Sequence, residues 1–505
     1  MSIYGGYYNP YLGAKELVES GVIKLRWHDR MQRRPPLIPP EVNLADRIEG
    51  MLLGLAIGDS LGNTSESMLP DARLQRHGRI EMYLPNRHAD DQRVGLPSDD
   101  TQMAFWTLEH LLAEGRIDMR PLGIALSRRK IFGLGQSVRE FLRNFKSGSD
   151  WTLAGAPSAG NGALMRIAPV LLPYLKDREA TVWSAALMAG HLTHRDALSN
   201  VACVAFVQML FDLLARRTIP ESTWWVDTFL QACVDIEPDT TYQSRANHPP
   251  GFDGTLSGMI RDYVMPAVGK DITVTAACDI WHSGAYLLET VPSVIYILAQ
   301  YGHDPREAIL AAVNETKDND TIAAIVGAAV GALHGQSAFP RTWVDGLLGR
   351  TDSSDDGRVF ELIARAGNTF GYGVSKEVLA RVPEGHLDRP LLQPTVSSEQ
   401  FIRGQKIEVK SPTYWVKVFG MLHQSWAAID NLPHGGVRIW FFDDLGGVFD
   451  LLDYPTRQEA RTALRLNQWN VAVGHLYGSL GRPGPDFNWS DRNGRPYSTR
   501  QYWVG

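Results

Sequence analysis

The chain has 505 residues, 44% of them hydrophobic, which is enough for two or three domains with a sizeable core. A formal charge of −6 excludes a general electrostatic drive toward nucleic acid or anionic membranes, although a local basic patch remains compatible with it. Cys203, Cys233 and Cys278 show no paired spacing and cannot all form disulfides. We therefore expect buried thiols and a reducing compartment.

The N-terminal extension, residues 1–42, has neither the basic nor the apolar region of a secretory signal. No stretch approaches the roughly 20 apolar residues that a membrane span needs, so we expect a cytoplasmic protein without a membrane partner. The extension contains a helical pattern around Lys15–Leu25. It also contains the proline cluster Pro35–Pro40, which cannot continue a helix and predicts an extended connector.

Apolar residues recur at helical spacing from about Leu44 to Arg381, for example in Ala180–Gly190 and Ala197–Arg216. Few segments in this block alternate like strands. We predict an all-α domain over residues 43–390.

Two segments of this domain carry glycine at every fourth position. An interior helical glycine costs about 0.5–1 kcal/mol relative to alanine. The repetition indicates that close approach of two helices offsets this cost, with generic helix packing as the simpler interpretation. We expect the two helices to pack centrally and to bring Asp59 close to Asp318–Thr321. The glycines are Gly50, Gly54, Gly58 and Gly62 in the first segment and Gly327, Gly331 and Gly335 in the second.

Two acidic clusters, Ser98-Asp99-Asp100-Thr101 and Asp318-Asn319-Asp320-Thr321, each lead into an apolar helical run. Carboxylates and hydroxyls form the oxygen-only ligand set that Mg²⁺, Ca²⁺ or Mn²⁺ prefers. Each cluster taken alone is also a common helix N-cap. A third polar turn runs from Asp59 to Glu66, and capping does not require so many carboxylates. The combination therefore predicts one metal site assembled by folding.

The sequence changes in texture after about Pro390, and residues 391–505 are predicted to form a small α+β module. Strands are expected at Lys406–Val409 and Val437–Phe442, and a helix at Arg457–Leu476. The module holds six tryptophans, which favour an aromatic core over a contact surface. Its arginine-rich tail is interpreted as solvated, with a nucleic-acid or protein contact as the alternative. These residues are Trp415, Trp426, Trp440, Trp469, Trp489 and Trp503, and Arg482, Arg492, Arg495 and Arg500.

Five motifs in order and well separated resemble those of the ADP-ribosylglycohydrolase family, which includes the dinitrogenase reductase-activating glycohydrolases and ADP-ribosylhydrolases. The resemblance spans about Leu44 to Arg381 and leaves out both the extension and the C-terminal module. The motifs are Gly58-Asp59-Ser60-Leu61-Gly62 with Glu66, Ser98-Asp99-Asp100-Thr101, Gly160-Asn161-Gly162-Ala163-Leu164-Met165-Arg166, His191-Leu192-Thr193-His194 and Asp318-Asn319-Asp320-Thr321.

The resemblance implies a mainly α fold, a compact all-α bundle, with two Mg²⁺ ions that Mn²⁺ could replace. Asp320 would bridge the two ions. One ion would be held by Ser98, Asp99, Asp100 and Asp320, and the other by Asp318, Asp320 and Thr321 with Glu66 close by.

The same resemblance implies hydrolysis of the bond between C1 of a ribose in ADP-ribose and its acceptor, through an oxocarbenium-like transition state. Glu66 would activate the water or gate the site. The loop Gly160-Asn161-Gly162 would cradle the diphosphate through exposed amides ahead of a helix, although such a triplet is more often only a turn. Asp59 and His194 would also contact substrate. A histidine at a helix end is otherwise usually a packed side chain.

The sequence departs from the family pattern at Lys317, where glycine is usual before the second acidic motif. This lysine could weaken metal binding, contact a phosphate or point outward. Ser98 replaces the more common threonine and keeps the hydroxyl ligand.

The leading hypothesis is an Mg²⁺-dependent hydrolase that releases ADP-ribose from a modified protein or another ADP-ribosylated macromolecule. The main alternative is an ADP-ribose-binding or immunity-type protein that blocks an ADP-ribosylating toxin or transferase without turnover. A third possibility is a metal-dependent hydrolase of a different small molecule, because a fold does not fix its substrate.

Overall fold

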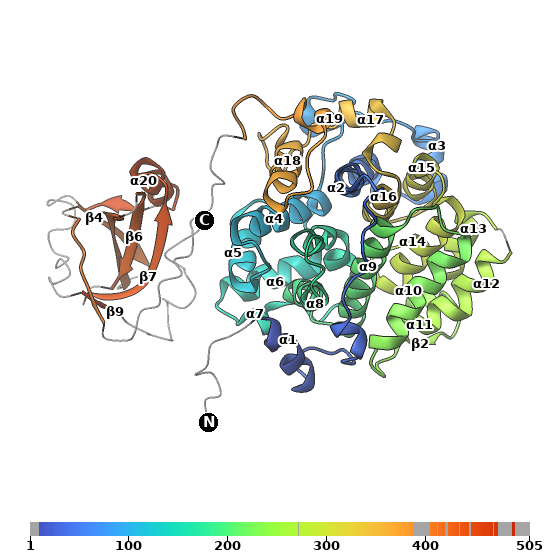
Figure 1. The fold of residues 1–505 in the computed structure, drawn as a ribbon, viewed down its shortest axis with the longest axis horizontal. Coiled ribbons are helices and arrows are strands. Elements are labelled where there is room, and N and C mark those ends of the chain that lie inside the picture. Colours follow the sequence, from blue (N-terminus) through green and yellow to red (C-terminus); the bar gives the residue numbers. More distant parts are fainter. Residues whose placement is uncertain are drawn as a thin grey trace. The chain divides into compact units, whose positions relative to one another are not determined.

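The computed structural model describes residues 10–270, 272–387, 405–411, 413–419, 423–433, 435–443, 446–467, 469–472 and 487–489. The chain divides into two compact units, one built mainly from residues up to 388 and one built mainly from residues 389 onward. Figure 1 shows the first unit as a bundle of helices and the second as a small sheet with one helix. The sequence predicted this combination of a mainly α fold and a small α+β module.

The described part of the first unit contains nineteen α-helices and one short antiparallel hairpin, so the all-α prediction is confirmed apart from that hairpin. Its strands are β1 (Tyr242–Gln243) and β2 (Asp253–Gly254). The helices are α1 (Pro10–Glu19), α2 (Leu44–Gly62), α3 (Pro70–His77), α4 (Asp99–Glu114), α5 (Met119–Arg128), α6 (Gln136–Lys146), α7 (Trp151–Ala154), α8 (Thr181–Thr193), α9 (Ala197–Ala215), α10 (Ser222–Ile236), α11 (Leu256–Met259), α12 (Met265–Val268), α13 (Val274–Trp281), α14 (Leu287–Tyr301), α15 (Pro305–Glu315), α16 (Asn319–His334), α17 (Arg341–Gly346), α18 (Arg358–Phe370) and α19 (Lys376–Leu379).

The N-terminal helix α1 ends earlier than the sequence pattern suggested. It stops at Glu19 because Gly21 adopts a left-handed conformation with φ of 77°, which breaks the helical run predicted to reach Leu25. The proline cluster Pro35–Pro40 forms no helix, as expected. The three cysteines are free and buried, as predicted.

Helix α9 is apolar on all sides. Contrary to the expectation that no stretch approaches the length of a membrane span, this helix is, among the described residues, the one long and apolar enough to cross a membrane, yet 89% of that stretch is buried inside the fold. Such burial on every face is typical of a central core helix.

The two glycine-ridged helices, α2 and α16, pack directly against each other (Figure 1). A Cβ atom added to Gly54 would lie 2.1 Å from the carbonyl oxygen of Gly327, and one added to Gly331 would lie 2.0 Å from that of Gly50. Real Cβ atoms do not approach this closely, so only glycine permits the packing distance. The predicted close approach is confirmed.

The same packing continues to the end of α2. A Cβ atom on Gly58 would lie 2.1 Å from the carbonyl oxygen of Ala323, and one on Gly62 would lie 2.5 Å from the Cα atom of Asp320. The last turn of α2 therefore lies against the first turn of α16. This register is what brings Asp59 to the second acidic cluster.

The second unit is a seven-stranded sheet in the order β3-β9-β7-β6-β5-β4-β8. Its neighbours pair antiparallel except for β7 and β9, which are parallel. Both faces of the sheet carry buried apolar clusters, and α20 contributes to one of them. The elements are β3 (Lys406–Ile407), β4 (Tyr414–Phe419), β5 (His423–Asn431), β6 (Val437–Phe442), β7 (Gly447–Tyr454), α20 (Arg457–Leu466), β8 (Asn470–Val471) and β9 (Phe487–Trp489).

Two sequence predictions for this unit were incomplete or wrong. Strands were predicted at β3 and β6 but not at β4, β5, β7, β8 and β9. The helix predicted to reach Leu476 ends at Leu466, because Asn467 caps it and the chain then pairs as β8 with β4.

The aromatic-core interpretation is confirmed for Trp415, Trp426, Trp440 and Trp469, which are all buried. The Trp489 side chain, Trp503 and the four tail arginines lie outside the described residues.

We predict that Gly54→Ala destabilises the protein by about 1–3 kcal/mol, because the added methyl group forces two packed backbones apart. Thermal or denaturant unfolding measures the loss. Gly269→Ala is the matched control, since Gly269 lies on the surface at φ −69° and its Cβ would meet no atom closer than 3.8 Å. Equal unfolding midpoints for the two variants would contradict the proposed role of the ridge.

Candidate metal centre

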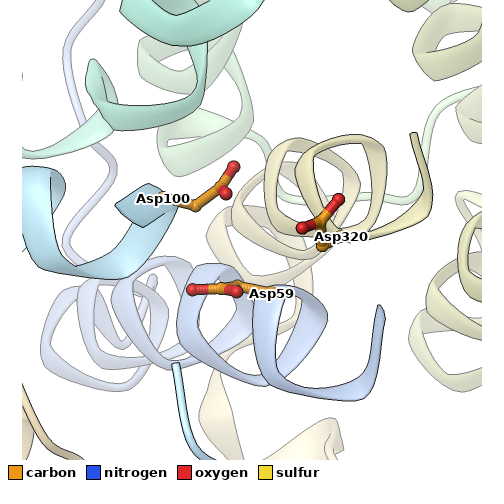
Figure 2. Close-up of side chains that lie close together, drawn as sticks. All are labelled: Asp59, Asp100 and Asp320. Atoms are coloured by element: carbon orange, nitrogen blue, oxygen red, sulfur yellow. The ribbon is translucent and has the colours of Figure 1, made fainter. Parts of the chain in front are cut away.

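Three helix ends meet at one acidic site. Asp59 lies in the last turn of α2, Asp100 in the first turn of α4, and Asp320 in the first turn of α16. One carboxylate oxygen from each lies within 4.8 Å of the others, and Figure 2 shows the three side chains converging. The positive ends of α4 and α16 favour negative charge at two of these positions.

A second group of ligand atoms shares Asp320 with the first. Oxygens of Glu66, Asp318 and Asp320 also lie within 4.8 Å of one another. Asp320 therefore belongs to both groups, so its carboxylate could contribute oxygen ligands to either.

Asp59 is fully buried and fixes the start of α4 through hydrogen bonds. It accepts hydrogen bonds from the backbone amides of Ser98 (2.8 Å) and Thr101 (3.1 Å) and from their hydroxyls at 2.7 and 2.6 Å. Asn63 adds a side-chain amide at 3.0 Å. Burial raises the pKa of Asp59 and these donors oppose that shift. The residue predicted to contact substrate thus has both oxygens engaged within the protein.

The hydroxyl of Ser98, predicted as a metal ligand, donates its proton to Asp59. A hydroxyl that donates keeps its lone pairs for a cation, so the two roles are compatible.

Asp100 is the carboxylate whose surroundings best fit a role as a cation ligand. Its side chain is buried, and its Oδ1 atom has no hydrogen-bond partner among the described residues. Burial, followed by the charges of Asp59 and Asp320, raises the pKa of Asp100 well above its usual value. An unpaired buried carboxylate oxygen is costly, and a bound cation would remove that cost.

Asp320 is also buried, and its Oδ1 accepts the backbone amide of Thr321 at 2.9 Å. Burial and the charge of Asp318 raise its pKa well above the usual value. The oxygen donor set and this mutual repulsion both fit a hard divalent cation.

Asp318 connects the metal centre to the glycine loop. Its Oδ2 accepts a hydrogen bond of 2.6 Å from Asn161 Nδ2, which also bonds to the Thr290 hydroxyl at 3.0 Å. Burial raises the pKa of Asp318 to about 6. The amide side chain of Asn161 thus fixes the position of one predicted ligand.

Glu66 lies on the turn that follows α2, and its side chain is exposed at the edge of the site. Partial desolvation and the charge of Asp59 raise its pKa. Of the remaining predicted ligands, Thr321 is buried in the first turn of α16. Asp99 is half-buried beside Gly133, whose Cβ would lie 2.9 Å from Asp99 Oδ1. Asp99 is not a member of either ligand group.

The glycine loop differs in detail from the expected anion cradle. The amide of Gly160 donates to Ser158 Oγ at 3.2 Å, and that of Asn161 donates to the Ala285 carbonyl at 3.0 Å. Two amides predicted to be exposed are therefore engaged, since the loop pairs with a neighbouring segment. The chain continues as a 3₁₀-helix, Asn161–Arg166, and not as an α-helix.

His194 packs against this loop. A Cβ atom on Gly162 would lie 2.9 Å from its Cε1 atom, so a larger residue there would have to displace the His194 ring. Its Nδ1 atom bonds to the Thr193 hydroxyl, and burial lowers its pKa to about 3. His194 is therefore a neutral side chain at the loop. His191 bonds to the Thr152 carbonyl, away from the acidic site.

Lys317, the departure noted in the sequence, is exposed. Its backbone amide donates to Ser283 Oγ at 3.0 Å, and its charge opposes the rise in the pKa of Asp318.

Sequence reasoning missed several residues that organise the site. Asn63, Arg73, Thr290 and Asn319 all bond to ligands or to their neighbours. Asn319 stood inside an acidic motif and could have been noticed. Arg73 gave no signal, because a single arginine in a short polar helix is normally solvated.

Known proteins of similar sequence include ADP-ribosyl hydrolases. A dinitrogen reductase ADP-ribosyl glycohydrolase of Rhodospirillum rubrum is 25% identical over 328 residues, covering 64% of this chain and 97% of that protein. The ADP-ribosylarginine hydrolase Tri1 of Pseudomonas putida is 26% identical and covers 64% of this chain and 78% of its own length. The ADP-ribosylhydrolase ARH3 of Xenopus tropicalis is 24% identical, with 62% and 93% covered.

The profile of the ADP-ribosylglycohydrolase family matches residues 40–369, a range that contains both acidic clusters, the glycine loop and Glu66. The chain belongs to the ADP-ribosylglycohydrolase family.

Proposed function

We propose that this protein is an Mg²⁺-dependent hydrolase that releases ADP-ribose from a modified macromolecule. The proposal is carried by two sets of carboxylates that share Asp320, together with the unpaired Oδ1 atom of Asp100. The members are Asp59, Asp100 and Asp320 in the first set and Glu66, Asp318 and Asp320 in the second. Relatives named as ADP-ribosyl hydrolases of a protein or of arginine support the reaction class.

Two divalent cations fit the donors present. Asp100 and Asp320, with the lone pairs of Ser98, would hold one, and Asp318, Asp320 and Glu66 would border the other. Such cations supply Lewis acidity toward the ribose hydroxyls and the attacking water.

The protein's own residues would then bind the substrate, orient it and move a proton. Gly160 and Gly162, both half-buried, would offer a small-residue surface to the diphosphate and ribose, and the buried, neutral His194 packs against this loop. Glu66 lies at the exposed edge with a raised pKa, which makes it a better proton acceptor than an ordinary glutamate. It would take a proton from the water whose oxygen bonds to C1 as the bond from C1 to the acceptor breaks. The departing acceptor would take a proton from solvent, to which Glu66 would later return its own.

We predict that Asp320→Asn lowers Mg²⁺-dependent release of ADP-ribose at least about 100-fold, because this carboxylate serves both ligand groups. The assay uses ADP-ribosylated arginine, serine and nucleic-acid substrates, with and without Mg²⁺. Asp227→Asn, on the exposed face of α10, is the control and should keep full activity.

Release that persists in Asp320→Asn would refute the metal-centred mechanism. If the unaltered protein releases nothing from any substrate yet binds ADP-ribose, the binding-protein alternative replaces the hydrolase.

A second prediction concerns stability and pH. Folding raises the pKa of Asp318 from 3.8 to about 6. The ionised carboxylate therefore destabilises the fold, and this loss of stability is fully present above about pH 6. It disappears as pH falls from about 6 toward 3.8 and the folded protein takes up the proton. Asp100 and Asp320 shift in the same direction. In chelator, the unfolding temperature should therefore rise as pH falls from about 7.5 to about 5.5.

Added Mg²⁺ should raise the unfolding temperature more at the higher pH, because the cation binds the ionised carboxylates. The Asp318→Asn variant should show a weaker pH trend in chelator. A Mg²⁺ effect that is equal at both pH values would contradict the assignment of these carboxylates as ligands.

A further inference from the structure

Arg73 is a fully buried arginine in the short helix α3, next to the metal centre. Its guanidinium donates to oxygens from two separate segments of the chain. From the turn after α2 these are Ser65 Oγ (3.1 Å) and the Met68 carbonyl (2.9 Å), and from the segment before α16 the carbonyls of Asn314 (3.3 Å) and Thr316 (2.7 Å).

Each of these two segments also carries a predicted functional residue. Ser65 directly precedes Glu66, and Thr316 lies two residues before Asp318. Weaker contacts to the carbonyls of Ser65 and Lys317, at 3.4 and 3.5 Å, reinforce the same link. Arg73 thus joins the turn that bears Glu66 to the segment that bears Asp318.

Asn319 forms a second link between the same segments. Its Nδ2 atom lies 3.1 Å from the Gly62 carbonyl, from Ser65 Oγ and from the Val313 carbonyl. The Ser65 hydroxyl is the meeting point, since it accepts from both Arg73 and Asn319. A buried network of this kind fixes a geometry that neither segment would hold alone.

The charge of Arg73 has no carboxylate partner among the described residues; its hydrogen bonds go to carbonyl and hydroxyl oxygens. Burying an arginine in this way is expensive. The nearby negative charge is that of the metal centre, and Asp320 is the group whose charge acts on the guanidinium. Because Arg73 does not bond to the carboxylates, it leaves their oxygens available to cations.

Lysine could not replace these bonds. The planar guanidinium reaches several acceptors in fixed directions, whereas an ammonium is a single point on a flexible stem. The number of acceptors therefore indicates that the planar set of N–H donors matters, and not only the positive charge.

We propose that Arg73 is a positioning residue of the metal centre: it holds the Glu66 turn against the Asp318 segment and supplies a fixed positive charge behind the carboxylates. The proposal rests on the cation site of the proposed function but not on the identity of the substrate.

The test uses Arg73→Lys in the full chain and two readouts other than activity. We expect Mg²⁺ and Mn²⁺, titrated calorimetrically into the chelator-treated protein, to bind roughly 10–100-fold more weakly, the usual effect of losing an outer support of a metal site. We also expect faster amide hydrogen exchange over residues 62–70 and 314–320.

Arg47→Lys is the matched control. Arg47 lies on α2 and also donates to three carbonyls, those of Leu213, Leu214 and Arg216, at the end of α9. This variant should lose some stability but keep the metal affinity and the exchange pattern of the unaltered protein. If Arg73→Lys does not fold, Ser65→Ala removes the shared acceptor without stranding a charge, and it should weaken metal binding in the same direction.

The proposal is overturned if Arg73→Lys keeps the metal affinity and the amide exchange of the unaltered protein. Where only Ser65→Ala folds, the same result in that variant overturns it. Either outcome holds even if the protein proves to be an active hydrolase. Weakened metal binding in a protein that releases no ADP-ribose would instead support the positioning role and count against the proposed substrate.

Discussion

The contact between α2 and α16 is the constraint on which the site depends. Two backbones meet at distances that exclude any side chain at Gly54, Gly327 and Gly331. Each interior glycine costs about 0.5–1 kcal/mol in helix propensity, and close packing along the whole interface offsets this. These contacts fix the register of the two helices, so that the last turn of α2 lies against the first turn of α16. Asp59 and Asp320 are neighbours for that reason, although 260 positions separate them in the sequence.

That packing assembles a set of carboxylates that repel one another. Asp100, Asp318 and Asp320 all have raised pKa values, with burial as the main cause and neighbouring charge as the second. A protein gains nothing in stability from such a cluster alone. The helix N-termini at α4 and α16 reduce the cost, and the donors around Asp59 hold one member in place. A bound divalent cation would remove the remaining repulsion and would link the stability of the fold to its chemistry.

Much of this arrangement could be predicted from sequence because its signals are periodic or local. The four-residue glycine spacing predicted the helix pair, and the acidic clusters predicted which helix ends meet. The positions of Asp99, Asn161 and Arg73 could not be predicted, since each depends on contacts between segments distant in the chain. The amides of the glycine loop were misjudged for the same reason: pairing with Ala285 is a tertiary event. In the second unit, β4, β5 and β7 were missed because strands buried on both faces lack a clear alternation of polar and apolar residues.

Lys317 stands where glycine is usual in the family, and its exposure limits its effect on the site. Its backbone is held by Ser283 and Arg73, so the residue's effect on the site must come from its side chain. That side chain is exposed. Two unit charges 4 Å apart in water interact by only about 1 kcal/mol, and salt screens this interaction further. The attraction of several buried carboxylates for a divalent cation is much larger, because it acts in a medium of lower dielectric constant. The exposed charge of Lys317 is therefore too weakly coupled to these carboxylates to prevent a cation from binding to them.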